Sequence, residues 1–181
     1  MTTIDLGRPV EGDVIDLIID DHQRFERLMR TMRDSSADRD AARRAFSALH
    51  VAHALAEEEL VYPKLRHKDA IDEHEAEHGE EEHAEGNQAL LALLELKGTD
   101  TQAYDEALEK LCEMVNHHLV EEELTILNPA RTEVGEKVRS DLGTAFAARR
   151  NELIDEGCGS VEQVRELVAR AERQGVLDEE E

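Results

Sequence analysis

The sequence predicts an all-α protein, an antiparallel up-down-up-down four-helix bundle with a C-terminal helical extension. Composition is the first observation: only three prolines and no tryptophan occur among 181 residues, alongside many alanine, leucine, glutamate and arginine residues. The second is that apolar residues recur at helical spacing in long segments. The third is that short connections separate these segments, which places consecutive helices side by side in opposite directions.

The first two helices are separated by a short polar segment. The first helix has an apolar stripe made of Val14, Ile18, Phe25, Met29 and Met32. The segment DSSAD, residues 34–38, ends this helix and can cap the next one. The second helix runs through Phe46 and Leu60 and ends near residues 63–67.

Two further helices complete the predicted bundle. The third carries Leu90 and Leu94 until the segment KGTDT, residues 97–101, interrupts it. The fourth ends around Pro129, and its apolar positions are Tyr104, Leu108, Leu111, Val115 and Ile126. We therefore assign residues 1–131 to the bundle.

Residues 132–181 are expected to form the helical extension. A fifth helix is predicted over residues 134–156, closed by GCG at residues 157–159. Ser160 precedes Gln163 by three residues, which is typical of a capping box at the start of a sixth helix. We expect this extension to pack on the bundle or on a partner.

The charge balance limits the classes of partner. The chain has 21 basic and 44 acidic side chains, a net charge of −23. Such a surface repels phosphate backbones and anionic lipids, so neither nucleic acid nor membrane is expected as a partner. Cys112 and Cys158 are far apart and indicate reduced thiols. With no apolar run of membrane-spanning length and no secretory signal pattern, a cytoplasmic protein is expected.

Histidines occupy positions where a plain helical core would be apolar. Residues equidistant from the turn of an antiparallel helix pair lie at the same height in the bundle. Four histidines, one on each helix, meet this condition when consecutive ones are compared. They are His22, His53, His83 and His118. At about 100° per residue, His22, His53 and His83 also share the arc of the apolar residues on their helices.

Glu57 lies one turn after His53 and shares its inward face. A lone buried histidine is most often a hydrogen-bonded core residue. Burial of several imidazoles and carboxylates would, however, cost several kcal/mol unless each group is paired. Coordination of a metal satisfies all these groups at once, so the pattern favours a metal site.

The register of the fourth helix decides which of its polar residues point inward. A literal overlay of VNHHLVEEEL on the earlier VAHALAEEEL selects His117 and Glu121, but it sets charged residues such as Lys110 against apolar ones. A shift by one residue restores the apolar stripe and selects His118 and Glu122. The predicted metal ligands are therefore His22, His53, Glu57, His83, His118 and Glu122.

Other residues with metal-binding side chains are weaker candidates. His74 and His78 have the i, i+4 spacing of a two-ligand face, but they point away from the direction of His83, so we expect them to be solvated. Four histidines and two glutamates suit a pair of iron ions better than manganese or zinc. A ferritin-like site would need Glu-x-x-His on two helices, and the inward faces of the second and fourth helices lack it.

The segments DDHQRFERLM, HALAEEELVYP, EEHAEGNQALLALL and HLVEEELTIL resemble hemerythrin-like, or HHE cation-binding, domains. The resemblance covers roughly residues 14–129. It implies a non-haem di-iron centre, oxo- or hydroxo-bridged, in a four-helix bundle that reacts with dioxygen or related small molecules. Residue by residue, it places the family's ligands on His22, His53, Glu57, His83, His118 and Glu122.

One position departs from the family's pattern. Oxygen-carrying hemerythrins have a fifth histidine, from a His-x-x-x-His on the third helix, and here Gly79 stands four residues before His83. The departure implies an open or water-filled position on one iron, which favours peroxide, oxygen or nitric oxide chemistry over reversible oxygen carriage. His50 and Glu26 lie at heights from which they could fill it; we expect them to support the ligands instead.

Two classes of function are compatible with these residues. The first is a di-iron redox protein that decomposes peroxide or senses dioxygen or nitric oxide. The second is a metal-binding module without turnover, which stores iron or signals through the C-terminal helices. The expected partners are small molecules, O2, H2O2 or NO, together with a protein partner or a second copy bound through the C-terminal helices.

Overall fold

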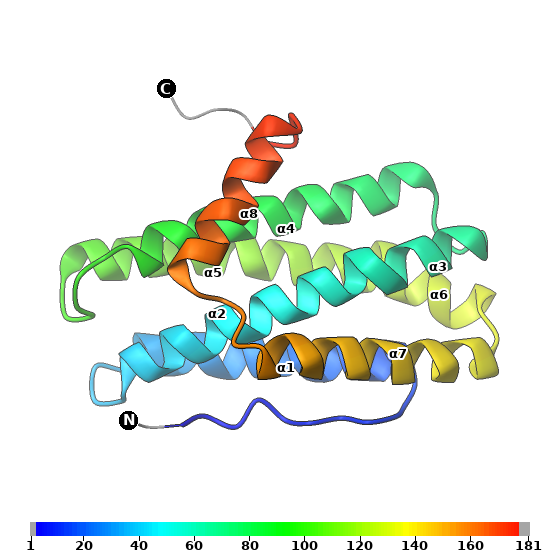
Figure 1. The fold of residues 1–181 in the computed structure, drawn as a ribbon, viewed down its shortest axis with the longest axis horizontal. Helices are drawn as coiled ribbons and strands as arrows, with labels where there is room; N and C mark the ends of the chain where they lie inside the picture. Colours follow the sequence, from blue (N-terminus) through cyan, green and yellow to red (C-terminus); the bar gives the residue numbers. More distant parts are fainter. Residues whose placement is uncertain (1–2, 178–181) are drawn as a thin grey trace.

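The computed structural model describes residues 3–177, and every regular element in this range is helical (Figure 1). The long helices α1, α2, α4 and α5 form a bundle, in which α1 packs on α2 and α5, and α4 packs on α2 and α5. The predicted all-helical class is thus confirmed. The α-helices are α1 (Val14–Arg33), α2 (Arg39–Ala56), α3 (Tyr62–His67), α4 (Glu73–Leu94), α5 (Gln102–Glu122), α6 (Asn128–Glu133), α7 (Glu136–Asp155) and α8 (Val161–Arg173).

A side-chain oxygen caps the start of each bundle helix. Asp13, Asp38 and Asp72 accept backbone N–H groups at the start of α1, α2 and α4, and Thr101 does the same for α5. These caps satisfy N–H groups that have no partner within the helix. Asp38 and Thr101 lie in the two polar segments that the sequence predicted as breaks.

The second and fourth bundle helices each contain a π-helical turn. Residues Glu57–Val61 (η1) join α2 to α3, and residues Glu123–Leu127 (η2) join α5 to α6. A π turn inserts an extra residue into an α-helix and rotates the remainder of that helix, and such turns are frequent at functional sites. Both turns begin at the glutamate segment of their helix, which the α-helical spacing used for the sequence did not predict.

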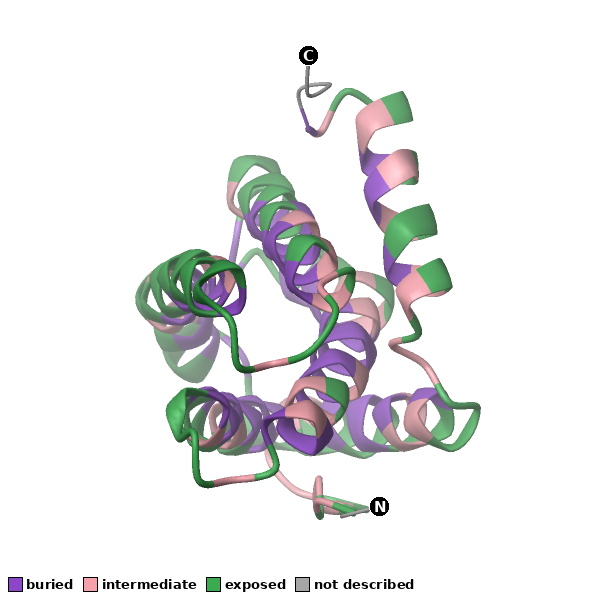
Figure 2. Ribbon diagram, turned by 90° about the vertical axis from the view of Figure 1, so that its left-hand side faces the viewer, coloured by how far each residue is buried: buried purple, intermediate pink, exposed green. Residues whose placement is uncertain are grey.

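The two larger apolar clusters of the described residues are separated by a polar layer, and a third, smaller cluster lies between α4 and α8. One of the two larger clusters includes Ile18, Val61 and Leu65, and the other includes Phe25 and Leu49. Between them lie buried polar residues, among which are His22, His53, Glu57, His83, His118 and Glu122. Figure 2 shows the buried faces of the bundle helices turned towards one another. The predicted histidine layer therefore lies inside the bundle.

The C-terminal helices differ in how they contact the bundle. Helix α7 packs along α1 and α2, and Phe146 and Ala147 on α7 belong to the first apolar cluster. Helix α8 crosses α4 and rises from the bundle (Figure 1). At its start Ser160 accepts the N–H of Gln163, whose side chain accepts the N–H of Gly159. The boundary after residue 131 stays a prediction.

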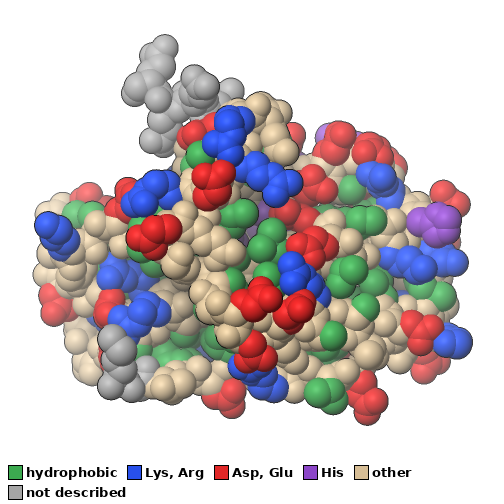
Figure 3. All heavy atoms as spheres, in the orientation of Figure 1, with side chains coloured by type: hydrophobic (Ala, Val, Ile, Leu, Met, Phe, Trp, Pro, Cys, Tyr) green, Lys and Arg blue, Asp and Glu red, His purple; other side chains and the backbone are tan. Residues whose placement is uncertain are grey.

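Acidic and basic side chains are interspersed over the face shown in Figure 3. None of the helices in the described part of the chain combines the length and apolarity needed to cross a bilayer.

Candidate metal centre

Glu57 lies between two histidines from different helices. Its carboxylate is fully buried, with Oε1 3.1 Å from His53 Nε2 and Oε2 3.2 Å from His83 Nε2. His53 lies on α2, one turn before Glu57, and His83 reaches in from α4. One carboxylate thus joins imidazoles from the two halves of the bundle.

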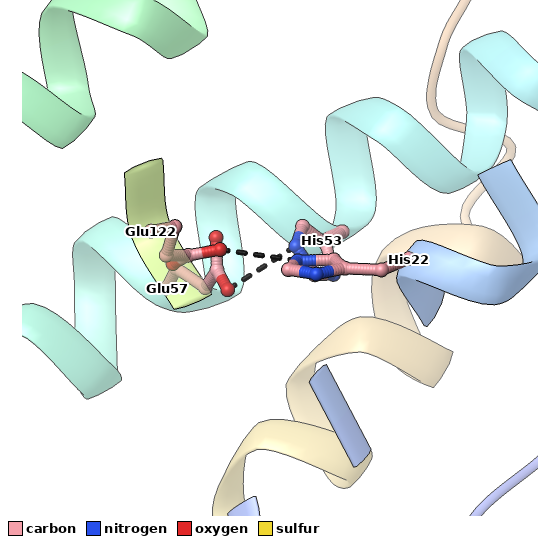
Figure 4. Close-up of side chains that lie close together, drawn as sticks. All are labelled: His22, His53, Glu57 and Glu122. Atoms are coloured by element: carbon pink, nitrogen blue, oxygen red, sulfur yellow. Dashed lines mark hydrogen bonds and ion pairs between the residues drawn. The ribbon is translucent and has the colours of Figure 1, made fainter. Parts of the chain in front are cut away.

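Glu122 holds the corresponding position at the end of α5. Its Oε2 lies 3.1 Å from His22 Nε2 and 3.7 Å from His118 Nε2. Its Oε1 accepts a hydrogen bond of 2.8 Å from the hydroxyl of Tyr62. Figure 4 shows Glu57 and Glu122 side by side, facing His22 and His53.

These side chains form two groups of potential ligands with one shared member. The ligand atoms within each group lie within 4.8 Å of one another; the groups are His22, His53, Glu57 and Glu122, and Glu57, His83 and His118. A carboxylate shared by two such groups can bridge two cations. The structure thus brings all six predicted ligands together in an arrangement suited to a pair of ions.

Several buried polar atoms at the centre of this cluster have no hydrogen-bond partner, and this shows whether a metal would fit there. His53 Nε2, His83 Nε2, His118 Nε2 and both oxygens of Glu57 are buried and make no hydrogen bond. The contacts of Glu57 are therefore close in distance but not aligned as hydrogen bonds, as expected of atoms directed at a common ion. Such atoms carry a desolvation cost of about 1–3 kcal/mol each when unsatisfied. The donor set, imidazole nitrogen with carboxylate oxygen, suits iron, manganese or zinc.

A second layer of carboxylates orients the four imidazoles. Each Nδ1 lies 2.8–3.3 Å from a carboxylate oxygen on another helix: His22 pairs with Glu123, His53 with Asp21, His83 with Glu58, and His118 with Glu82. An Nδ1–H that donates to a carboxylate leaves the Nε2 lone pair free for a metal and makes the imidazole a better donor.

The sequence reasoning missed these four carboxylates. Each is a chain neighbour of a predicted ligand: Asp21 and Glu82 precede the histidines of α1 and α4, Glu58 follows Glu57 in η1, and Glu123 follows Glu122 at the end of α5. The two halves of the bundle therefore repeat the same arrangement. The adjacent acidic residues were the available signal. Consecutive side chains of an α-helix point about 100° apart, however, so a ligand and its acidic neighbour were not expected to reach the same site.

The alternative residues lie elsewhere. The side chain of His117 is 59% exposed, and His74 and His78 are on the surface. Glu121 is partly exposed and belongs to neither group. Glu26 is exposed and pairs with Arg30.

His50 is buried beside the cluster but belongs to neither group of ligands. Burial, together with the charges of neighbouring histidines, lowers the pKa of His50 to about 3. It is therefore a neutral imidazole at physiological pH.

Tyr62 lies against Gly79, the position on α4 where oxygen-carrying hemerythrins have a fifth histidine. A Cβ atom on Gly79 would lie 3.0 Å from the Cε2 and hydroxyl atoms of Tyr62. The Tyr62 ring stacks on His83, with 5.8 Å between ring centroids and 10° between planes. The Tyr62 phenol thus fills the space beside Gly79, and the open or water-filled position on one iron stays a prediction.

Helix α7 contributes a buried cation to the second layer. The Arg150 guanidinium is fully buried and makes two hydrogen bonds to Asp21, of 2.6 and 2.8 Å. Burial alone would raise the pKa of Asp21, but hydrogen bonds from His53 and Arg150 hold it below its ordinary value. The C-terminal region is thereby connected to His53 through one carboxylate.

Buried imidazoles and a shared carboxylate at the centre of a helical bundle define a metal-binding bundle. The chain belongs to the hemerythrin HHE cation binding domain family, whose match covers residues 13–130. Comparisons with curated proteins and with solved structures gave no match.

Proposed function

We propose that this protein holds two iron ions between its bundle helices and uses them to react with dioxygen, hydrogen peroxide or nitric oxide. The sharing of Glu57 between two groups of ligand atoms carries this proposal. Bound iron supplies redox chemistry and an affinity for small oxygen- and nitrogen-containing molecules. The proposal includes an alternating up-down direction of the four bundle helices, which their short connections support.

In this proposal, the ligands divide between the two ions. His22 and His53 hold one ion and His83 and His118 hold the other, while Glu57 joins them. Glu122 is fixed by Tyr62, and each imidazole is oriented through its Nδ1. Manganese and zinc have the same donor preferences and are the less favoured occupants.

Limited space around the ligands supports small substrates. The cavity beside His53, His83 and His118 has a volume of about 10 Å³, enough for one water-sized molecule. An organic substrate would not fit without rearrangement of the bundle. Peroxide decomposition and gas or redox sensing are therefore the activities that we propose.

A second candidate is a metal-binding module without turnover, which stores iron or signals. The link from His53 through Asp21 to Arg150 favours signalling, because α7 touches the second layer directly. A protein partner or a second copy of the chain would then be bound through the C-terminal helices.

Peroxide consumption by the iron-loaded protein separates the two candidates. We expect steady-state decomposition of hydrogen peroxide that is lost in His118→Ala and retained in the matched surface variant His117→Ala. Stoichiometric iron without sustained consumption of peroxide would favour the second candidate. Equal turnover in both variants would place the chemistry outside this site.

A further inference from the structure

Two hollows lie on either side of His50 and Asn87. The inner one is the cavity of about 10 Å³ against the candidate ligands, which His50, Phe25 and Gly86 also line. The outer one is a pocket of about 110 Å³ between α2, α4 and α8, which Asn87 lines. His50 lines only the inner cavity and Asn87 lines only the outer pocket, so these two side chains separate the two hollows, and we call the pair the neck.

The outer pocket combines apolar walls with polar groups. Val51, Leu55 and Leu167 line it, as do Glu58, Glu80 and Arg170. Glu58 also accepts the Nδ1–H of His83, so the pocket reaches the second layer of the site. Helix α8 lines one side of this pocket, and α8 lies outside the part of the chain that the family match covers.

The neck carries unsatisfied polar atoms. His50 Nε2 and Asn87 Oδ1 are buried and make no hydrogen bond. The Asn87 side chain lies close enough to His50 to affect the pKa of that imidazole, and the His50 ring stacks on Phe46 with 12° between planes. Unpaired buried polar atoms destabilise the fold, and a small polar molecule at the neck would satisfy them.

Gly86 lets α4 approach the His50 ring closely. A Cβ atom at this position would lie 3.1 Å from His50 Cε1 and 3.4 Å from His50 Nε2. Gly86 is inside α4, where glycine is less favourable than alanine. Any larger residue at position 86 would therefore press on the His50 ring, so the glycine keeps that imidazole and its unpaired nitrogen in place.

We propose that the pocket under α8 is the entrance to the metal centre for a small molecule without net charge, and that His50 and Asn87 bind this molecule at the neck. This inference rests on the proposed function, because the metal centre is the place that the molecule would reach. The inner cavity limits the size of the molecule, because even two heavy atoms fit there only with local adjustment. Absence of net charge follows from the apolar walls and from the mixed signs of Glu58, Glu80 and Arg170, which together favour neither an anion nor a cation.

The kinetics of nitric oxide binding test this route without measuring turnover. Iron content and absorption are determined first for each variant, so that loss of the metal site is recognised separately. Leu167→Ala widens the outer pocket and should raise the association and dissociation rates of nitric oxide together, by about threefold or more, with an unchanged equilibrium constant. Leu91→Ala is the matched control, because Leu91 also packs beneath α8 without lining the pocket.

Two variants act on the neck itself. Gly86→Ala adds a methyl group beside His50 and should slow both rates, while helix propensity favours folding of this variant. Asn87→Leu removes the amide and should slow binding as well. Rates equal to wild type in Leu167→Ala, Gly86→Ala and Asn87→Leu, with iron content intact, would overturn the proposed entrance and leave the metal site standing.

A second measurement does not depend on iron. Dissolved dioxygen is paramagnetic and speeds the relaxation of methyl groups close to the places it visits. Val51 and Leu90 are equally buried, and only Val51 lines the pocket. In the protein as purified we expect dioxygen to affect the Val51 methyls several-fold more than those of Leu90. Equal effects would contradict entry of small molecules at this pocket.

Discussion

Tyr62 donates a hydrogen bond of 2.8 Å to Glu122 and at the same time covers the face of α4 at Gly79, one turn before His83. Its phenol is fully buried, and burial together with the carboxylates of Glu122 and Glu57 raises the pKa of Tyr62 well above the ordinary value. It is therefore a neutral donor. Tyr62 takes the space of a fifth histidine and fixes a predicted ligand.

Tyr62→Phe tests this role of the hydroxyl. The ring and its stacking on His83 remain, while Glu122 Oε1 loses its donor and becomes free to rotate. We expect the variant to fold, to bind iron about 10- to 100-fold more weakly, and to react faster with nitric oxide or peroxide. Iron titration and stopped-flow absorption provide the measurements. Unchanged iron affinity would show that Glu122 is held by its other contacts.

The register of α5 is tested by two pairs of adjacent residues. His118→Ala and Glu122→Ala should each abolish the iron absorption spectrum, because these residues face the cluster. His117→Ala and Glu121→Ala should leave the spectrum largely intact, because neither belongs to the groups of ligand atoms. The reverse pattern would mean that α5 is rotated by one residue.

Arg150 should be far more important for stability than the neighbouring Arg149. Arg150→Met removes the fully buried cation beside Asp21 and leaves that carboxylate with only His53 and the partly exposed Arg24, and breaking a buried ion pair costs about 3–5 kcal/mol of the free energy of unfolding. Arg149 makes surface contacts with Glu59 and Glu152, so Arg149→Met should cost less than about 1 kcal/mol. Urea denaturation measures both variants, and equal losses would contradict a buried ion pair between Arg150 and Asp21.

Metal binding and protonation compete for the same imidazoles. Burial alone would lower the pKa of His53, but Glu57 and Asp21 outweigh it and raise that pKa to about 10 in the metal-free protein. The pKa of His83 is likewise raised, through Glu57 and Glu58 and against the effect of burial. Protonated imidazole cannot coordinate a metal, so competition extends above the ordinary histidine pKa of ~6.5.

The sign of the resulting pH dependence is set by these raised values. In the metal-free protein, the paired imidazolium of His53 stabilises the fold fully below pH ~6.5, and this contribution is lost as the pH rises through about 10. Stabilisation by bound metal grows over the same interval as protons are released. The gap in melting temperature between metal-loaded and metal-free protein should therefore widen from pH 5 to pH 8.5. Identical melting curves at pH 7 would refute a structural metal site.

Much of the fold could be predicted because turn residues and apolar periodicity agree. Asp38 and Thr101 lie in breaks predicted from the sequence and do cap the next helices. The location of a polar layer was predicted by counting residues between turns. The π turns η1 and η2 could not be predicted in this way, because an apolar stripe continues across them and the extra residue leaves no compositional signal.

The site was predictable only where burial and residue type pointed the same way. The facing of His53 on α2 and of Glu57 at the start of η1 could be inferred from the apolar stripe around them. The Nδ1 partners could not, because whether Glu58 or Glu123 reaches a histidine depends on the rotation introduced by a π turn. Arg150 resembles its surface neighbour Arg149 in sequence, and only the packing of α7 on α1 distinguishes them.

Metal analysis of freshly purified protein, with an absorption spectrum, tests the central claim most directly. The shared carboxylate of Glu57 between two groups of imidazoles predicts about two irons per chain and the near-ultraviolet absorption of a coupled ferric pair. Stoichiometric zinc alone, or no bound metal at all, would contradict the di-iron centre, and hydrogen-bonded core histidines would then be the better account of the layer.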